Sequence, residues 1–315
     1  MKVRPAGLLD LSRIEEMHRS SEIKLSEAEP PAARLWSLLS STLSALLPLS
    51  QESLMYVAEA GGKVVGFIQA SGQPLSLDLR RARVLQVLNL HVADGADSDE
   101  VAPALVQHLC NQALERGALR LFVRLPDHDP LLPAFRLKGF RQYATEQVVY
   151  SEKPKRRSSQ YPDGLRAWKR GDDRKLYQLY RKVTPQGVSQ VEAPTYRDWK
   201  AMHIAEVGGG SVVDRVETVA WVRMDRGSGA RPDTLRFMAL PEHPLPAELA
   251  DYGISLLGDS DAPAWSSLRH YDSPMIDALR GRGFSVLLTQ LLLVKELAVR
   301  VPKAVREKGL VPSFG

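Results

Sequence analysis

The residue best suited to acid–base chemistry is a histidine at the end of an apolar run. Residues 84–92 read Val-Leu-Gln-Val-Leu-Asn-Leu-His-Val, and this pattern predicts a strand over 83–92 with His91 near its end. An imidazole titrates close to neutral pH, so His91 could act as a general base toward a substrate. The alternative is an ordinary polar residue at a strand end, and both interpretations stay open.

An acidic turn follows that strand. Asp97-Ser98-Asp99-Glu100 precede a segment of helical spacing over 101–116, which Gly117 is predicted to close as a C-cap. The amides at a helix start can bind phosphate, but carboxylates there repel it, by roughly 4 kcal/mol for two charges about 4 Å apart near a protein surface. Acidic residues are also ordinary N-terminal capping residues, and we favour that role here.

Other groups that could bind a metal or attack a substrate lack the required spacing. The 7 histidines show no metal-site spacing with acids or with each other, so no metal is expected. The sole cysteine, Cys110, lies within the helical pattern and is predicted to be a small core residue. One cysteine cannot form a disulfide within one chain.

The chain repeats itself over a long distance. Residues 129–140 match residues 273–284, a spacing of 144 positions (283 − 139), and the two starts match at a spacing of 162 (166 − 4). The matched residues include Gly139 with Gly283, Arg4 with Arg166 and Asp10 with Asp172. A period this long indicates two copies of one domain of about 150 residues, not a solenoid.

Both copies are predicted to follow one order of elements, β-α-α-β-β-β-α-β-α-β. In the first copy, strands are predicted at 3–4, 55–58, 64–70, 83–92, 119–125 and 143–150, with helices at 8–19, 35–47, 101–116 and 130–137. In the second copy, strands are predicted at 165–168, 212–214, 218–224, 234–240, 264–268 and 285–294, with helices at 173–181, 194–206, 246–257 and 274–280. This order predicts an α/β fold with a mixed, mostly antiparallel sheet flanked by helices.

The domain boundaries follow from composition. The charged, aperiodic segment 151–163 is predicted to be a linker between a domain over 1–150 and a second, reduced domain over 164–297, with a basic tail over 298–315. The run 287–294 is expected to supply core to the sheet of its own copy.

Net charge and hydropathy exclude several classes of partner. Much of the +5 net charge lies in the linker and the tail, without the exposed aromatic residues that a nucleic-acid surface requires. The most apolar segment, 35–47, is too short to span a bilayer. We therefore expect no nucleic-acid or membrane partner. No signal-peptide pattern precedes the first predicted strand, so we expect a cytoplasmic protein, and the oligomeric state stays open.

Taken together, the ordered set of Arg116-Gly117, the strand after it and the Gly-Phe pair resembles the GNAT N-acyltransferase superfamily, in tandem. That resemblance implies a fourth strand that splays from the fifth, with acetyl-CoA or another acyl-CoA in the gap. It also implies acyl transfer to an amine of a small molecule or peptide, with His91 as the candidate catalytic base. The positions implied for donor binding are Leu90, Val92, Asp97, Ser98, Asp99, Glu100, Val101 and Ala102.

The donor motif is degenerate in both copies. The family carries Gln/Arg-x-x-Gly-x-Gly/Ala at the helix start, whereas the first copy has acids and no glycine, and only Ala102 fits. The tyrosine that commonly protonates the leaving thiolate is replaced by Phe135 and Leu279. The second copy has three prolines over 241–246, and prolines lack the amide donors that a phosphate needs. We therefore predict that the second copy does not bind CoA.

Two functions stay open on this basis. The first is an acyl-CoA-dependent N-acyltransferase that uses the first copy. The second is a non-catalytic binding or scaffold protein with degenerate CoA sites in both copies, since a fold does not by itself determine function. Tyr143 and Glu146 are predicted either to line an acceptor groove or to lie on an outward strand face.

Overall fold

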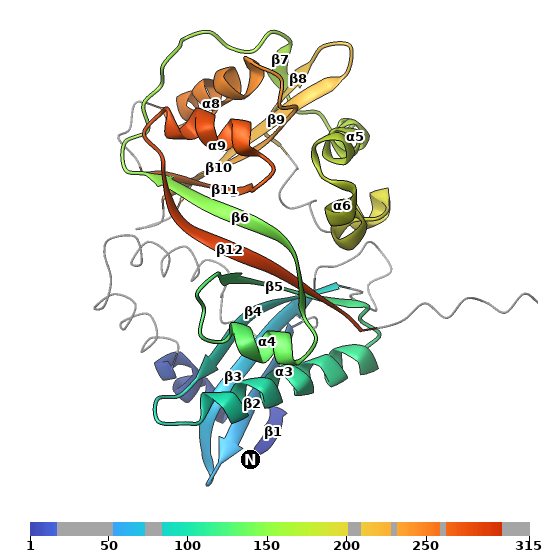
Figure 1. Cartoon of the computed structure of the whole chain (residues 1–315), viewed down its shortest axis with the longest axis vertical. Helices are drawn as coiled ribbons and strands as arrows, with labels where there is room; N and C mark the ends of the chain where they lie inside the picture. Colours follow the sequence, from blue (N-terminus) through green and yellow to red (C-terminus); the bar gives the residue numbers. More distant parts are fainter. Residues whose placement is uncertain (18–52, 73–83, 201–208, 228–231, 259–262, 298–315) are drawn as a thin grey trace, which may run out of the picture.

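The computed structural model describes residues 1–17, 53–72, 84–200, 209–227, 232–258 and 263–297 (Figure 1). The strands of the first half are β1 (Lys2–Pro5), β2 (Ser53–Ala60), β3 (Lys63–Gly72), β4 (Val84–Val92), β5 (Arg120–Pro126) and β6 (Arg141–Ser151). Those of the second half are β7 (Leu165–Ala167), β8 (Ser211–Asp214), β9 (Thr218–Asp225), β10 (Asp233–Ala239), β11 (Ala264–Arg269) and β12 (Ser285–Glu296). The helices are η1 (Leu8–Asp10), α3 (Ser98–Glu115), α4 (Leu132–Leu137), α5 (Asp173–Val183), α6 (Gln186–Glu192), α8 (Leu245–Ser255) and α9 (Ser273–Arg280).

These strands form one 12-stranded sheet across the described residues, in the order β1-β2-β3-β4-β5-β12-β6-β11-β10-β9-β8-β7. The pairs β4–β5 and β10–β11 are parallel, and the other neighbours are antiparallel. This confirms the predicted α/β class with a mixed, mostly antiparallel sheet. We call β1–β5 with α3 and α4 the first unit, and β7–β11 with α5, α6, α8 and α9 the second unit.

The repeated residues of the sequence occupy equivalent places in the two units. Arg4 pairs with Asp10 at 2.7 Å and with Glu59 of β2 at 2.9 Å. Arg166 pairs in the same way with Asp172 at 2.8 Å and with Asp214 of β8 at 2.9 Å. Each of these arginines therefore ties the first strand of its unit to the next strand and to the turn that follows.

The Gly-Phe pairs are also equivalent. Gly139 has a φ of +81° and Gly283 a φ of +90°, a left-handed conformation that side chains other than glycine rarely adopt. In both units the amide of the following phenylalanine donates to the carbonyl five residues earlier, that of Phe135 or Leu279. The turn at the end of α4 and of α9 is therefore the same structure twice.

The last strand of each half lies beside the other unit. β12 lies between β5 and β6, and β6 in turn pairs with β11 (Figure 1). Leu291 and Leu293 of β12 belong to the core beneath α3, and Val149 of β6 belongs to the core beneath α8 and α9. The expectation that the run 287–294 supplies core to its own sheet was wrong, because an apolar run fits equally well between other strands. The proposed division at 151–163 stays a prediction.

The first unit packs apolar side chains on both sheet faces. Leu54, Tyr56 and Ala58 of β2 contact the α3 side, whereas Met55 and Val57 belong to the cluster on the opposite side. This alternation is the two-residue period of a strand buried on both faces. Cys110 is buried among the α3 core residues, which confirms its predicted core role, and burial raises the pKa of its thiol.

The structure does not test two of the helical predictions in full, and it contains one helix that was not predicted. The helix predicted over 35–47 lies outside the described residues, as does the end of the one predicted over 194–206. The short helix α6 was not predicted, because seven residues after Pro185 are too few to show a helical period. Its residues Val188 and Val191 pack on β5, β6 and β12, so α6 covers the strands that the two halves share.

Candidate functional site

The two parallel strands of the first unit, β4 and β5, stop pairing partway along their length, and we call the unpaired stretch between them the opening of this unit. β4 and β5 pair from Val84–Arg120 to Gln86–Phe122, yet β4 continues to Val92 and β5 to Pro126. The strands therefore diverge over their second halves, as the resemblance implies for the place of an acyl donor. Residues Asn89–Val92 of β4 border this opening and pair there with β3.

His91 lies on the sheet face opposite α3. Its ring stacks on that of Phe67, with the ring centroids 4.9 Å apart, and Phe67 packs with Ile14 and Met55 on that face. Leu90 and Val92, which alternate with it, pack on the α3 side. The strand therefore presents His91 to one side of the opening and apolar residues to the other, and its role as a base stays a prediction.

The start of α3 is capped by its own acidic side chain. Asp97 is the N-cap, and its Oδ1 accepts a hydrogen bond of 2.9 Å from the amide of Asp99. The amide of Val101 donates to the Asp97 carbonyl, and the side chains of Val101 and Ala102 are buried in the core. An amide that a diphosphate would need is therefore taken by a carboxylate, and the exposed acids add repulsion. This helix start is capped as we expected and does not fit the diphosphate of an acyl-CoA.

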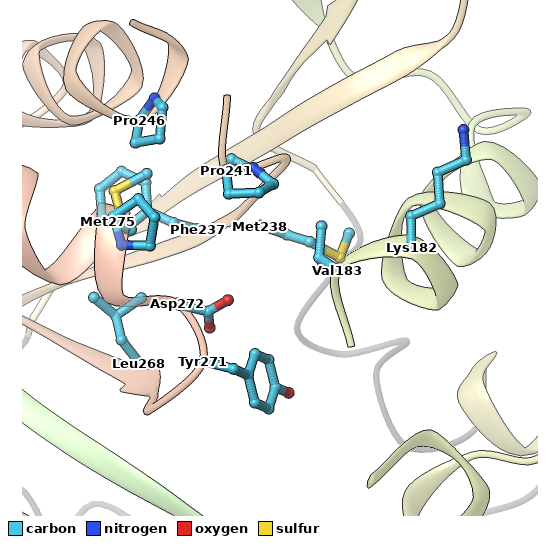
Figure 2. A pocket seen from close by; sticks show the side chains of 12 residues that line it. Lys182, Val183, Phe237, Met238, Pro241, Pro246, Leu268, Tyr271, Asp272 and Met275 are labelled. Atoms are coloured by element: carbon cyan, nitrogen blue, oxygen red, sulfur yellow. The ribbon is translucent and has the colours of Figure 1, made fainter. Parts of the chain in front are cut away.

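The second unit has an equivalent opening with different chemistry. β10 and β11 pair only at Asp233–Ala264 and Thr234–Trp265, and each then continues, to Ala239 and to Arg269. A pocket of about 510 Å³, its open mouth included, lies there (Figure 2). Its walls come from residues 182–183 of α5, 237–239 of β10, and 271, 272, 274 and 275, together with Pro241, Pro246 and Leu268.

The helix start beside this pocket offers few amide donors. Pro244 is the N-cap of α8 and Pro246 lies in its first turn, so neither position has an N–H. The amide of Leu245 donates to the carbonyl of Glu242, and the amides of Ala247 and Glu248 donate to that of Pro244. Leu279, at the place of the family's acidic tyrosine, is fully buried in the core. These contacts support the prediction that the second unit does not bind CoA.

A buried polar cluster lies under α6, where the two halves meet. Arg269 at the end of β11 donates to Glu192 of α6 at 2.5 Å, and its guanidinium lies 3.6 Å from Glu146 of β6. Tyr143 and Tyr180 donate to the same Glu192 at 3.0 and 3.2 Å. Only 14% of the Arg269 side chain is exposed, and the two glutamates are more buried still.

This cluster corrects one of the two predictions for Tyr143 and Glu146. They do not lie on an outward strand face, because α6 covers them. The sequence did not reveal Glu192 or Arg269 as their partners. A glutamate in an unpredicted helix and an arginine at a strand end carry no local signal of pairing.

Burial sets the protonation of the groups around the pocket. Burial raises the pKa of Asp272 to about 6, although its carboxylate accepts a hydrogen bond of 3.3 Å from the amide of Arg269. Burial also raises the pKa of Tyr271. Burial lowers the pKa of Arg269, but the attraction of Glu192 and Glu146 outweighs this and raises it well above its ordinary value. Asp272 is thus the group here that can exchange a proton near neutral pH.

The described residues provide neither a metal site nor a membrane span. They contain no group of three or more His, Cys, Asp or Glu side chains that could hold a metal ion. Among the helices of these same residues, none is both long enough and apolar enough to cross a bilayer.

Comparisons with known proteins agree with this fold. Residues 13–140 match the model of the Acetyltransferase (GNAT) family, while no curated protein sequence matches the chain significantly. A solved GCN5-related N-acetyltransferase from Sphaerobacter thermophilus is 15% identical, with a TM-score of 0.60 over 95% of this chain and 96% of that one. A tandem GNAT protein from the clavulanic acid biosynthesis pathway is also 15% identical, with a TM-score of 0.53 over 95% of this chain and 99% of that one.

A glucosamine N-acetyltransferase region of a fungal multi-domain β-N-acetylglucosaminidase is similar in the same way. It is 14% identical, with a TM-score of 0.58 over 93% of this chain and 38% of that one. At such identities the likeness concerns the fold and not the substrate. Residues 13–140 thus match the GNAT family, and the fold of the whole chain, with its two similar units, is that of solved GNAT proteins that include a tandem one.

Proposed function

We propose that the protein is an acyl-CoA-dependent N-acyltransferase whose first unit receives the acyl donor. The observation that carries this proposal is the divergence of β4 and β5 after Gln86–Phe122, within the segment 13–140 that matches the family. The donor would enter between the diverging strands, whereas the acidic start of α3 opposes its diphosphate. We therefore expect acetyl-CoA to bind weakly.

In this proposal the acceptor is an amine of a small molecule or peptide. His91 lies on the face opposite α3, with its ring stacked on Phe67, so an amine approaching from that face would meet it. A neutral imidazole there takes the proton that the attacking amine must lose. Stacking on a buried ring also fixes the orientation of the imidazole, and positioning contributes much of the rate in such a site.

Titration of the full chain with acetyl-CoA tests the donor site. Replacing Asp97, Asp99 and Glu100 by Gly, Arg and Gly frees the Asp99-position amide and removes the repulsion, so affinity should increase at least tenfold, or about 1.4 kcal/mol. The matched control is Glu115→Arg, which adds charge at the exposed C-terminal end of the same helix, about 24 Å away at the helical rise of about 1.5 Å per residue. That control should leave affinity unchanged.

Two outcomes would contradict parts of this account. If the natural protein binds acetyl-CoA at low micromolar concentration and the triple variant binds no better, the role given to the acidic turn is wrong. If neither protein binds it at millimolar concentration, the acyltransferase proposal fails.

The second candidate function is a non-catalytic binding protein. The hydrogen bond from the Asp99 amide to Asp97 favours this alternative, because that amide is then not free to donate to a phosphate. The pocket of the second unit favours it as well, because that opening combines an apolar wall with a helix start poor in amide donors. Absence of acetyl-CoA binding together with retained binding of a small ligand would support this alternative.

A further inference from the structure

We infer that the pocket between β10 and β11 binds a small apolar amine in its protonated form, with Asp272 as the counter-ion. This site is separate from the acyl-donor site proposed for the first unit. It rests on the shape and lining of the pocket and on the charges around it.

The walls of the pocket suit an apolar body. Apart from Lys182, Tyr271 and Asp272, every side chain that lines it is apolar. Phe237, Met238 and Met275 surround the space from β10 and α9, as Figure 2 shows. Thioether and aromatic side chains adapt to ligands of varied outline, and apolar walls with few polar groups are typical of small-molecule sites.

One carboxylate faces this apolar space. Figure 2 shows the Asp272 side chain pointing into the region between Leu268 and Met238. Within the part of the chain that the structure describes, the carboxylate accepts one hydrogen bond, from the Arg269 amide, and forms no ion pair. A half-buried carboxylate that forms no ion pair is less stable than one in water, and a cation in the pocket would supply the missing charge.

The neighbouring cations are directed elsewhere. The Lys182 ammonium pairs with Glu217, and in Figure 2 its side chain points away from Asp272. The Arg269 guanidinium pairs with Glu192 and Glu146. Glu146 and Glu192 thus share one guanidinium, and Asp272 adds a third negative charge near this cluster. This excess of negative charge favours a cationic ligand and disfavours an anionic one.

The same lining disfavours an acyl-CoA. The prolines at the start of α8 lack N–H groups, and the Leu245 amide is already bonded to Glu242. A ligand without phosphate groups does not need these amide donors, so their absence does not weaken its binding. An ammonium group attached to an aromatic or aliphatic body therefore matches both parts of the pocket, the carboxylate and the apolar wall.

The experiment uses the full chain and three probes of one size. Phenethylamine, phenethyl alcohol and phenylacetate carry positive, neutral and negative head groups on one aromatic body. Titration calorimetry at neutral pH should show that the amine binds at least tenfold more tightly than the alcohol, and that phenylacetate binds most weakly. Equal affinity for the amine and the alcohol, or no binding of the amine at millimolar concentration, would overturn the proposal.

Variants then assign the effect to Asp272. Asp272→Asn keeps the shape and the capping position, so amine affinity should fall to that of the alcohol while alcohol affinity stays unchanged. The matched control, Asp277→Asn, removes an exposed carboxylate from the same helix and should change neither. If Asp272→Asn binds the amine as the natural protein does, Asp272 is not the counter-ion and the proposal is wrong.

A second variant keeps the test decisive if Asp272→Asn does not fold. Ala239→Phe fills the pocket from β10 and leaves Asp272 in place, so it should abolish binding of both the amine and the alcohol. Undiminished amine binding by Ala239→Phe would place the amine outside this pocket. None of these probes contains CoA. Failure of the amine to bind would therefore not contradict the acyltransferase proposal, and failure of acetyl-CoA to bind would not contradict the proposed amine site.

Discussion

The openings between the parallel strands of the two units lie at the same place in the fold but are bordered by different chemistry. In the first unit, His91 and an acidic helix start border the opening. In the second unit, Asp272 and a proline-containing helix start border it. The Arg4–Asp10 and Arg166–Asp172 pairs are nevertheless the same, so the two units share a scaffold but differ at the helix start beside the opening.

The largest difference between the units is the polar cluster around Arg269. The repeat spacing of 144 places Leu125 of the first unit at the position of Arg269, and Leu125 packs against the apolar core. Arg269→Leu therefore gives the second unit the residue of the first. It leaves Glu192 and Glu146 buried without their cation, and we expect a loss of about 3–5 kcal/mol in the free energy of unfolding. Urea denaturation of the full chain measures this.

The triple variant Arg269→Leu, Glu192→Gln, Glu146→Gln is the control for that experiment. It removes the buried charges together, so much of the lost stability should return, because neutral groups cost less to bury than unpaired ions. A triple variant no more stable than Arg269→Leu would mean that packing, and not charge, makes the arginine necessary.

The shared strands provide the second comparison. Leu293 comes from the second half of the sequence but is fully buried in the first unit's core. Leu293→Ala should cost about 2–5 kcal/mol, the range for truncating a buried leucine, and hydrogen exchange should increase first in α3. Val149→Ala, a truncation in β6, should instead increase exchange in α8 and α9, because Val149 packs in that core. Increased exchange in α8 and α9 for Leu293→Ala would contradict this assignment of the two strands.

The smallest effect concerns protonation of Asp272. Its folded pKa is raised from 3.8 to about 6, so the folded state holds this proton more tightly than the unfolded state does. Ionised Asp272 therefore destabilises the fold at neutral pH, and Asp272→Asn should increase stability there by about 1–3 kcal/mol. The gain should shrink as pH falls from 6 and vanish below about 4, which urea denaturation at several pH values measures.

Asp277→Asn is again the matched control, because Asp277 lies exposed on the same helix. Its stability should follow that of the natural protein at every pH. If Asp272→Asn gains no stability at neutral pH, the carboxylate is not held at a raised pKa. The counter-ion role would then have to rest on the geometry of the pocket alone.

Local sequence features determined much of this fold. Gly61 and Gly62 predicted the hairpin between β2 and β3, and both have positive φ values in the structure. The recurring Gly-Phe pairs and arginine–aspartate pairs predicted the repeat. Each of these motifs spans only a few residues, a range over which backbone sterics and hydrophobic period decide the structure.

Tertiary structure alone decided which strands pair and which charges meet. Nothing in the apolar run of β12 specifies a place between β5 and β6, since a strand buried on both faces is compatible with many neighbours. Glu192 and Arg269 are 77 residues apart in the sequence and 2.5 Å apart in the fold. The candidate amine pocket likewise exists only because α5, β10, β11 and α9 converge. A hydrophobic period indicates which face of a helix or strand is buried, but which element packs on that face depends on the fold of the whole chain.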